Sequence, residues 1–547
     1  MNVFAKVAGL FKRKGPSELS PEALGLAVDA SEEASFITRI ENPTTQRERL
    51  KENLPPVQDV AGDVSPLNYA QATKWVSKAS LQGGPGAGLQ KRTAEGMGPG
   101  AAKTYPDAVR SLLRDAEKGD ATAQHKLGML FEKGSGVCQD GAEAARWYTR
   151  AAESGLAVAQ ARLGFMCEKG VGVAQNVTLA AKWYLQAAEQ GNDAGQLKIG
   201  LFYLEGQGVP LDFDAGVSWL TKSAEQNLAE GQFRLGVCYQ KGVGVGVSYY
   251  EAAKWYRRAA DQDHPNAQYN LGMLYRQGVG VPKDFVQAAM WFQKAAAQDF
   301  AEAQYMVAHS YENGTGVEQD LAKAAEWYGR AAEQGVLKAK HELGVFYEKG
   351  IGVGQDLAAA AKWYLEAAEG GYPAAAYRLA LCYEQGLGVA KDPTEFARWL
   401  RKAADKGHTG AQLKLGLILQ DQGPNAQAEA LKWVRKAAEQ GWAEAQYHLG
   451  RFYELGLGVA ANEAEALRLY RRSAEQGFVE AQATVAGFFA KGRATTQDFA
   501  EAYKWFDLAA AQGHASSAAN RDQLAHSMSP EQVSEGQRRT AAFKPKK

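Results

Sequence analysis

Positively charged side chains recur at one position of a repeating pattern, and they are the residues best placed to bind a partner. Each stands directly before a Leu-Gly pair or its equivalent, and the series is Lys126, Arg162, Lys198, Arg234, Arg378, Lys414 and His448. A row of cations would attract an acidic partner, chiefly by raising the association rate. The simpler interpretation is a solvated, lysine-rich face that nearby Glu132 and Glu168 balance.

Residue patterns for catalysis or metal binding do not occur in the sequence. The eight histidines form no His-Glu-x-x-His motif and no cluster with cysteines, and Ser-x-x-Lys is missing. Gly-x-Gly-Val turns such as 134–137 resemble phosphate-binding loops. Those loops follow a strand and occur once per domain, whereas these turns follow predicted helices in every ordinary repeat. We therefore expect no catalytic residues, no bound metal and no cofactor.

The elements that position the charged residues form a tandem repeat. Trp147 recurs every 36 residues as far as Trp399, and the next step is only 34 residues, to Trp433. A fixed period in this range is the sequence signature of a solenoid. Eleven units fit within residues 121–513, and the short one loses its two residues between Gln420 and Gln427.

Each unit predicts two short helices joined by a glycine turn. In the first helix, Ala123, Leu127 and Phe131 share one face. Gly128 has no side chain, so it lets a neighbouring helix approach closely. The second helix carries Trp147, which can bury a large apolar area. One helix pair cannot bury both of its faces, so stacked neighbours must complete the core.

These residues define the unit A-x-x-x-L-G-x-x-Y-x-x-G-x-G-V-x-x-D-x-x-x-A-x-x-W-Y-x-x-A-A-x-x-G, which resembles the Sel1-like repeat, a relative of the tetratricopeptide repeats. The resemblance covers about Ala121 to Gly513. It implies an α/α solenoid that serves as a protein-interaction platform, without naming a partner. We predict an all-α superhelical solenoid of about eleven 36-residue helix-turn-helix repeats with helical caps.

The first fourteen residues predict an amphipathic basic helix. Its apolar and basic residues include Phe4, Val7, Phe11, Lys12, Arg13 and Lys14. Such a helix can lie on a membrane surface or dock on a partner, and the alternative is that it packs on the chain's own solenoid. A secretory signal would put its charges first, and no stretch approaches the roughly 18 apolar residues of a transmembrane helix. We therefore expect a cytoplasmic protein.

The segments that flank the repeats have distinct expectations. Residues 15–104 predict a largely disordered linker with one repeat-like helix at 70–83, either a decayed outlying unit or a helix that folds back. Residues 105–120 predict an N-terminal capping helix. Residues 514–547 predict C-terminal capping helices and a basic tail, with a capping-box helix start at Ser529.

The predicted function is a non-enzymatic scaffold or adaptor that binds a partner protein or peptide on the concave face lined by the first helices. Lys and Arg number 62, as do Asp and Glu, so no nucleic-acid partner is expected. Departures from the repeat consensus are the candidate specificity residues, namely Asn270, Met306, His309 and Glu342. Two alternatives are membrane-linked regulation through residues 1–14 and a hydrolase of the penicillin-binding type.

Overall fold

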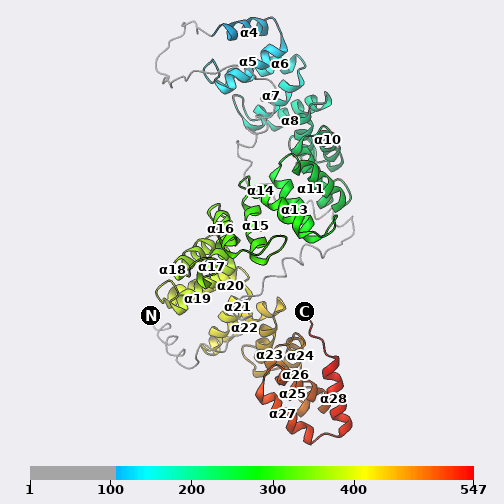
Figure 1. The fold of residues 1–547 in the computed structure, drawn as a ribbon, viewed down its shortest axis with the longest axis vertical. Helices are drawn as coiled ribbons and strands as arrows, with labels where there is room; N and C mark the ends of the chain where they lie inside the picture. Colours follow the sequence, from blue (N-terminus) through cyan, green and yellow to red (C-terminus); the bar gives the residue numbers. More distant parts are fainter. Residues whose placement is uncertain (1–105, 547) are drawn as a thin grey trace. The chain divides into compact units, whose positions relative to one another are not determined.

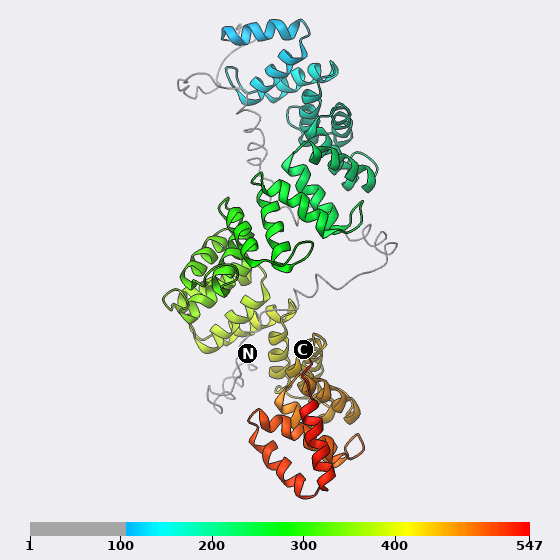
Figure 2. The same ribbon diagram turned by 45° about the vertical axis from the view of Figure 1, so that its right-hand side comes forward.

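The computed structural model describes residues 106–546, and the chain there consists of helical hairpins that follow one another in sequence order (Figures 1 and 2). Every regular element within these residues is a helix, and none is a strand. This confirms the predicted all-α solenoid. The predicted segments 1–14 and 15–104 lie outside the described residues.

Eleven hairpins make up the repeat array, and we call the first helix of each one helix A and the second helix B. The A helices are α5 (Ala121–Lys133), α7 (Ala157–Lys169), α9 (Asp193–Glu205), α11 (Ala229–Lys241), α13 (Pro265–Gln277), α15 (Ala301–Asn313), α17 (Leu337–Lys349), α19 (Pro373–Gln385), α21 (Thr409–Gln420), α23 (Ala443–Leu455) and α25 (Val479–Lys491). The B helices are α6 (Gly141–Glu153), α8 (Val177–Glu189), α10 (Phe213–Glu225), α12 (Tyr249–Ala260), α14 (Phe285–Ala296), α16 (Leu321–Glu333), α18 (Leu357–Glu369), α20 (Pro393–Asp405), α22 (Pro424–Glu439), α24 (Glu463–Glu475) and α26 (Phe499–Ala511). Each A helix packs on its own B helix and, after the first repeat, on the B helix before it.

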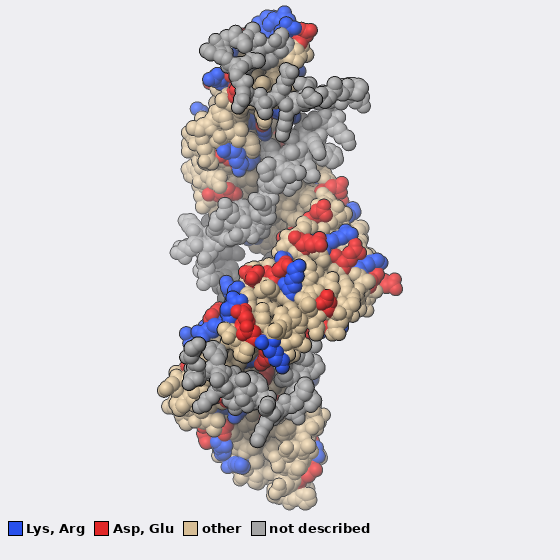
Figure 3. All heavy atoms as spheres, turned by 90° about the vertical axis from the view of Figure 1, so that its left-hand side faces the viewer, with Lys and Arg blue, Asp and Glu red and all other residues tan. Residues whose placement is uncertain are grey.

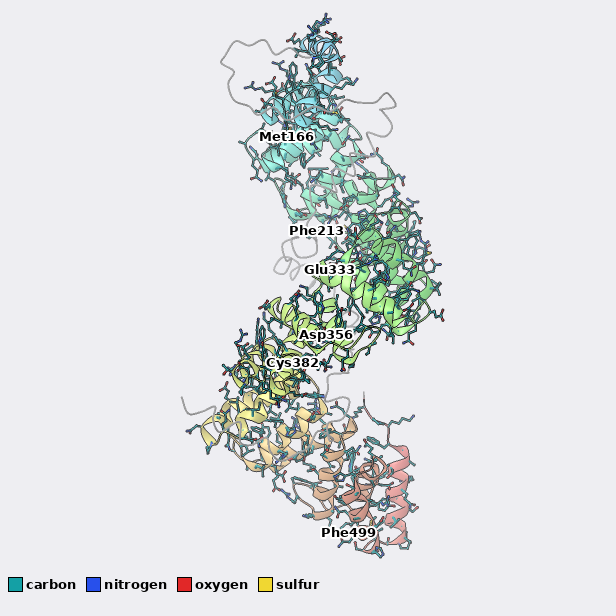
Figure 4. All side chains as sticks on the ribbon, turned by 60° about the vertical axis from the view of Figure 1, so that its left-hand side comes forward. Met166, Phe213, Glu333, Asp356, Cys382 and Phe499 are labelled. Carbon is teal, nitrogen blue, oxygen red and sulfur yellow. The ribbon has the colours of Figure 1, made fainter. Side chains whose placement is uncertain are left out.

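Local sequence explains where these helices begin and end. Gly134 ends α5 with a φ of 69°, a left-handed conformation that glycine adopts at little cost. Most B helices begin at a side-chain cap, and Asp356, labelled in Figure 4, caps α18 by accepting a hydrogen bond from the Ala359 amide at 2.9 Å. Such a cap satisfies an amide that has no partner within the helix.

The two helices of a hairpin meet at a glycine and an aromatic ring. A Cβ atom added to Gly344 of α17 would lie 2.6 Å from Cε1 of Tyr364 on α18, so only glycine fits there. Tyr364 is fully buried. The same contact joins Gly128 to Tyr148 in the first hairpin. The predicted close approach at the Leu-Gly pair is therefore confirmed.

After the first repeat, the second glycine of the Gly-x-Gly-Val turns packs the turn closely on the preceding repeat. A Cβ atom added to Gly208 would lie 2.5 Å from the carbonyl oxygen of Val177, at the start of α8. The φ of Gly208 is 66°, which also favours glycine. The turns thus join consecutive repeats backbone to backbone.

The short repeat loses its residues in the turn between its helices. α21 ends at Gln420 and α22 begins at Pro424, so the usual seven-residue connection is reduced to Asp421–Gly423, while α22 is longer than the other B helices, at 16 residues. The helices of this repeat still pack on each other, which keeps the array continuous.

Three further helices flank the array. α4 (Asp107–Glu117) packs on α5, and α27 (Ala515–His526) and α28 (Pro530–Ala542) both pack on α26. The capping box predicted at Ser529 is confirmed, since its side chain and that of Gln532 each accept a backbone hydrogen bond. After α28, the Phe543 ring meets Trp505 edge to face, and the Lys546 ammonium lies 2.7 Å from a carboxylate oxygen of Glu475.

Candidate functional site

The sixth residue of each A helix carries the series that the sequence analysis singled out. In chain order these residues are Lys126, Arg162, Lys198, Arg234, Asn270, Met306, Glu342, Arg378, Lys414, His448 and Thr484. They occupy the same position on successive A helices, so the structure places them in one row along the array. The ninth residues follow them by almost one turn and lie on the same helix side. We call the surface formed by the sixth and ninth residues the A-helix face.

Several cations of this row are held in ion pairs with the repeat before them. The guanidinium Nε of Arg162 donates to Oε2 of Glu132 at 3.0 Å, and the hydroxyl of Tyr148 donates to the same oxygen at 2.8 Å. One repeat later, the Lys198 ammonium lies 3.1 Å from Glu168. Each glutamate is the twelfth residue of the preceding A helix, and it receives both a tyrosine hydroxyl and a cation.

The same pairing returns near the end of the array. The guanidinium of Arg378 lies 3.6 Å from Glu348, and the Lys414 ammonium lies 2.8 Å from Glu384. Arg378 is buried, and Lys414 is half-buried. These cations therefore join consecutive repeats, and carboxylates neutralise much of the charge of the row. On the face shown in Figure 3, blue and red side chains are interspersed over the described residues.

Two carboxylates that pair with cations of this row, those of Glu168 and Glu230, have lowered pKa values. Burial acts to raise the pKa of Glu168, but Lys198 and the hydrogen bond from Tyr184 outweigh it, and the pKa lies below its usual value. Glu230 has a different arrangement, because it pairs within its own helix with Arg234 at 2.6 Å and contacts the His264 ring at 2.8 Å. Burial again opposes ionisation, yet these two partners lower the pKa of Glu230 to about 2.

The middle of the row departs from this pattern. Met306 is only 5 % exposed and belongs to the core between α15 and its neighbours. Glu342 stands where six other A helices carry a lysine or arginine. Among the described residues, the ion-pair partner of its carboxylate is the neighbouring His341 ring, at 3.4 Å. Asn270 and His309 are half-buried on α13 and α15. The specificity assigned to these departures stays a prediction.

Histidines on the A helices pack against aromatic rings or are withdrawn from solvent. His125 lies 5.4 Å from the ring centre of Tyr148, and His341 lies 5.8 Å from that of Tyr364. Burial and Arg451 lower the pKa of His448 to about 4, so its ring is neutral at neutral pH. Within residues 106–546, no three His, Cys, Asp or Glu side chains are grouped as metal ligands would be.

Apolar side chains dominate the ninth position of the A helices. Met129 is 36 % exposed, and the equivalent residues are half-buried. The apolar residues at this position are Met129, Phe165, Leu201, Val237, Met273, Val345, Leu381 and Leu417. His309 takes the place in α15. The A-helix face thus combines an apolar row with a partly neutralised polar row.

A row of glutamines escaped the sequence analysis. The side-chain amide of Gln160 donates to the Ala152 carbonyl at 3.1 Å, and its oxygen accepts from Gln190 at 2.7 Å. The fourth residue of most A helices repeats the second bond, at Gln196, Gln232, Gln268, Gln304, Gln412, Gln446 and Gln482. The recurrence of glutamine every 36 residues was the feature of the sequence from which this row could have been predicted. These hydrogen bonds join consecutive repeats.

The predicted membrane residues Phe4, Val7, Phe11, Lys12, Arg13 and Lys14 lie outside the described residues, and that hypothesis stays a prediction. Among the helices of residues 106–546, none combines the length and apolar character that crossing a membrane requires.

Known proteins share both the sequence pattern and the fold. The chain is 33 % identical to a protective antigen present in uropathogenic Escherichia coli strains, described as displaying an SLR fold, over 80 % of this chain and 94 % of that one, with a TM-score of 0.68. It is 32 % identical to a Sel1 repeat protein from Oxalobacter formigenes, over 59 % of this chain and 98 % of that one, with a TM-score of 0.46. No protein with a curated description matches significantly.

The Sel1 repeat family model matches twelve segments, one more than the repeats counted from the sequence. They are residues 61–84, 121–156, 157–192, 193–228, 229–264, 265–300, 301–336, 337–372, 373–408, 409–442, 443–478 and 479–514. The first match contains the repeat-like segment 70–83. Because the matches cover most of the sequence, the chain belongs to the Sel1 repeat family.

Proposed function

We propose that this protein is a non-enzymatic scaffold or adaptor that binds a partner protein or peptide along the A-helix face. Repeat solenoids commonly mediate protein–protein interaction, because stacked repeats present an extended surface. The observation that carries the proposal is the apolar row at the ninth position of the A helices.

Packing between repeats uses only part of the surface of the apolar ninth residues, most of which stay half-buried. The core between hairpins is formed by other positions, such as Leu271 and Leu274 of α13, which are nearly inaccessible to solvent. Met273, between them, is half-buried and packs at the edge of the next core, which includes Phe292 and Met306. An apolar side chain that recurs on a partly exposed face gains its remaining burial energy when a partner covers it.

Polar residues beside the apolar row supply specificity in this proposal. Asn270 and Glu342 interrupt the ion-paired cations on the central A helices α13 and α17. A polar group that a partner must satisfy discriminates between partners more sharply than apolar contact does. The partner's specific contacts therefore fall on the central repeats.

The charge of the preferred partner follows from which cations remain unpaired. Lys126 and Lys133 on α5 are exposed and have no ion-pair partner among the described residues. The cations of later repeats are largely paired with glutamates. An acidic partner segment thus belongs to the N-terminal end of the face. We place this activity in the cytoplasm, a location favoured by four cysteines that form no disulfide with one another.

Two matched substitutions test the face. Met273→Asp on α13 should remove the partner proteins that the tagged full-length chain retains. Val286→Asp on the following helix α14 should leave them bound, although Val286 is 63 % exposed. Val345→Asp on α17 provides a second substitution on the A-helix face, and thermal melting by circular dichroism checks that each variant is folded. Partner loss with Val286→Asp, combined with retention by both A-helix variants, would refute the proposal.

A further inference from the structure

Four contacts between consecutive A helices show what the twelfth-residue glutamate binds in this chain. Each glutamate holds a lysine or arginine from the sixth position of the next A helix. The pairs are Glu132 with Arg162, Glu168 with Lys198, Glu348 with Arg378, and Glu384 with Lys414. The twelfth-residue glutamate is therefore a cation-binding site, and in these four cases the next A helix supplies the cation.

The contact between α15 and α17 keeps this site but lacks the cation. Tyr328 donates its hydroxyl hydrogen to Glu312 at 2.6 Å, as the equivalent tyrosines do elsewhere. The next sixth residue is Glu342 instead of a lysine or arginine. Among the described residues, no Lys or Arg forms an ion pair with either carboxylate. We call Glu312, Glu342 and Tyr328 the α15–α17 site.

The electrostatics at this site are consistent with a missing cation. Burial raises the pKa of Glu312, and the Glu342 carboxylate raises it further, whereas Lys349 and the bond from Tyr328 lower it only in part. Glu168, at the equivalent position beside Lys198, has a lowered pKa. Two carboxylates that share a partly buried site repel each other, so an external positive charge stabilises both.

Aromatic and apolar groups around the site suit the stem of a long basic side chain. The rings of Tyr305 and Tyr328 lie 5.6 Å apart. Burial raises the pKa of Tyr305, and the nearby Glu342 and Glu312 carboxylates raise it further. Met306 belongs to the core against which Tyr305 packs. A lysine or arginine can lay its methylene groups on such rings while its charged end reaches the carboxylates.

We propose that the α15–α17 site binds a lysine or arginine side chain of the partner protein, which completes the arrangement that Arg162, Lys198, Arg378 and Lys414 complete from within the chain. This inference rests on the proposed function, because it names one anchor of a partner on the A-helix face. The partner's residue takes the place of the lysine or arginine that these other A helices carry at the sixth position.

A small probe tests the inference on the purified full-length chain. The tripeptide acetyl-Gly-Arg-Gly-amide should bind, and the same peptide with neutral citrulline in place of arginine should bind about tenfold more weakly, because it lacks the charge-assisted bonds. Glu342→Gln should weaken the arginine peptide by about the same factor. Ligand-observed nuclear magnetic resonance suits the weak affinity of so small a probe.

Glu342→Arg is the decisive variant, because it builds into α17 the cation that α19 carries as Arg378. It should abolish binding of the arginine peptide and raise the melting temperature together. Glu348→Gln is the matched control, since it removes the carboxylate that pairs with Arg378. It should lower the melting temperature and leave the binding of the peptide unchanged.

Other results would overturn the inference. Equal binding of the arginine and citrulline peptides, or a lower melting temperature of Glu342→Arg with intact peptide binding, would show that no cation is missing. Binding of calcium or magnesium at this site without binding of the arginine peptide would assign it to a metal ion instead. If Glu342→Arg retains the partner that Met273→Asp loses, the proposed function stands and this anchor alone fails.

Discussion

Replacing Gly344 by alanine tests how the hairpins are held together. Gly344 lies inside α17, where alanine is the better helix former by about 1 kcal/mol. An added Cβ would nevertheless lie 2.6 Å and 2.7 Å from two ring carbons of Tyr364, which is fully buried. Gly329, inside α16, is the matched control, because an added Cβ there meets nothing within 4 Å.

The two substitutions should change the free energy of unfolding in opposite directions. Over-packing of a core costs about 1–3 kcal/mol, and the Tyr364 ring cannot move freely, because its hydroxyl is bound to Glu348. Subtracting the helix-propensity gain, we expect Gly344→Ala to lose about 0–2 kcal/mol of stability. Gly329→Ala should gain about 0.5–1 kcal/mol, since only the propensity changes.

Urea unfolding followed by circular dichroism measures both variants against the parent chain. Long repeat arrays do not unfold in one step, so hydrogen exchange should accompany it and show lost protection in α17 and α18 for Gly344→Ala. A stabilised Gly344→Ala would refute the reasoning that this glycine is required by the contact with Tyr364.

Three further predictions address packing, pH and the N-terminal segment. Trp255→Ala should cost about 3–5 kcal/mol, because Trp255 is only 7 % exposed, and hydrogen exchange should rise mainly in α11 to α14; a loss below 1 kcal/mol would contradict this. Glu230→Gln should destabilise the chain at neutral pH, because the carboxylate pairs with Arg234. The folded pKa of Glu230 is lowered to about 2. The ionised carboxylate therefore contributes fully to stability above the unfolded pKa of about 4.3, and this contribution disappears as the pH falls through about 2. A difference in urea midpoint between Glu230→Gln and the parent chain that stays the same from pH 7 to pH 2 would be the contrary result. Phe4→Glu combined with Phe11→Glu should abolish liposome association if residues 1–14 bind membranes, and an absence of liposome binding by the parent chain at low salt ends that hypothesis.

The repeat architecture could be predicted because its causes are local and periodic. Trp147 and its equivalents fix the period, Gly134 and its equivalents end the A helices, and Gly128 marks where two helices touch. The helix start at Ser529 was predictable for the same reason, since a capping box involves only neighbouring residues.

The candidate site was harder to predict because its contacts join different repeats. From the sequence, Lys198 is indistinguishable from a solvated lysine. In the structure it pairs with Glu168, thirty residues earlier. The recurrence of a glutamate and a cation thirty residues apart was visible in the sequence, but which helices touch is decided by the stacking. The same holds for the bond between Gln160 and Gln190.

Site-specific photo-crosslinking tests the central claim, that the A-helix face binds a partner protein, most directly. A benzoylphenylalanine probe is placed at Met273 or Val345 on the A helices, and at Val286 or Lys254 on the B helices. Met273 and Val345 are half-buried, whereas Val286 and Lys254 are exposed. The account predicts a crosslinked partner from both A-helix probes and none from the B-helix probes. A partner crosslinked only through Val286 or Lys254 would contradict it.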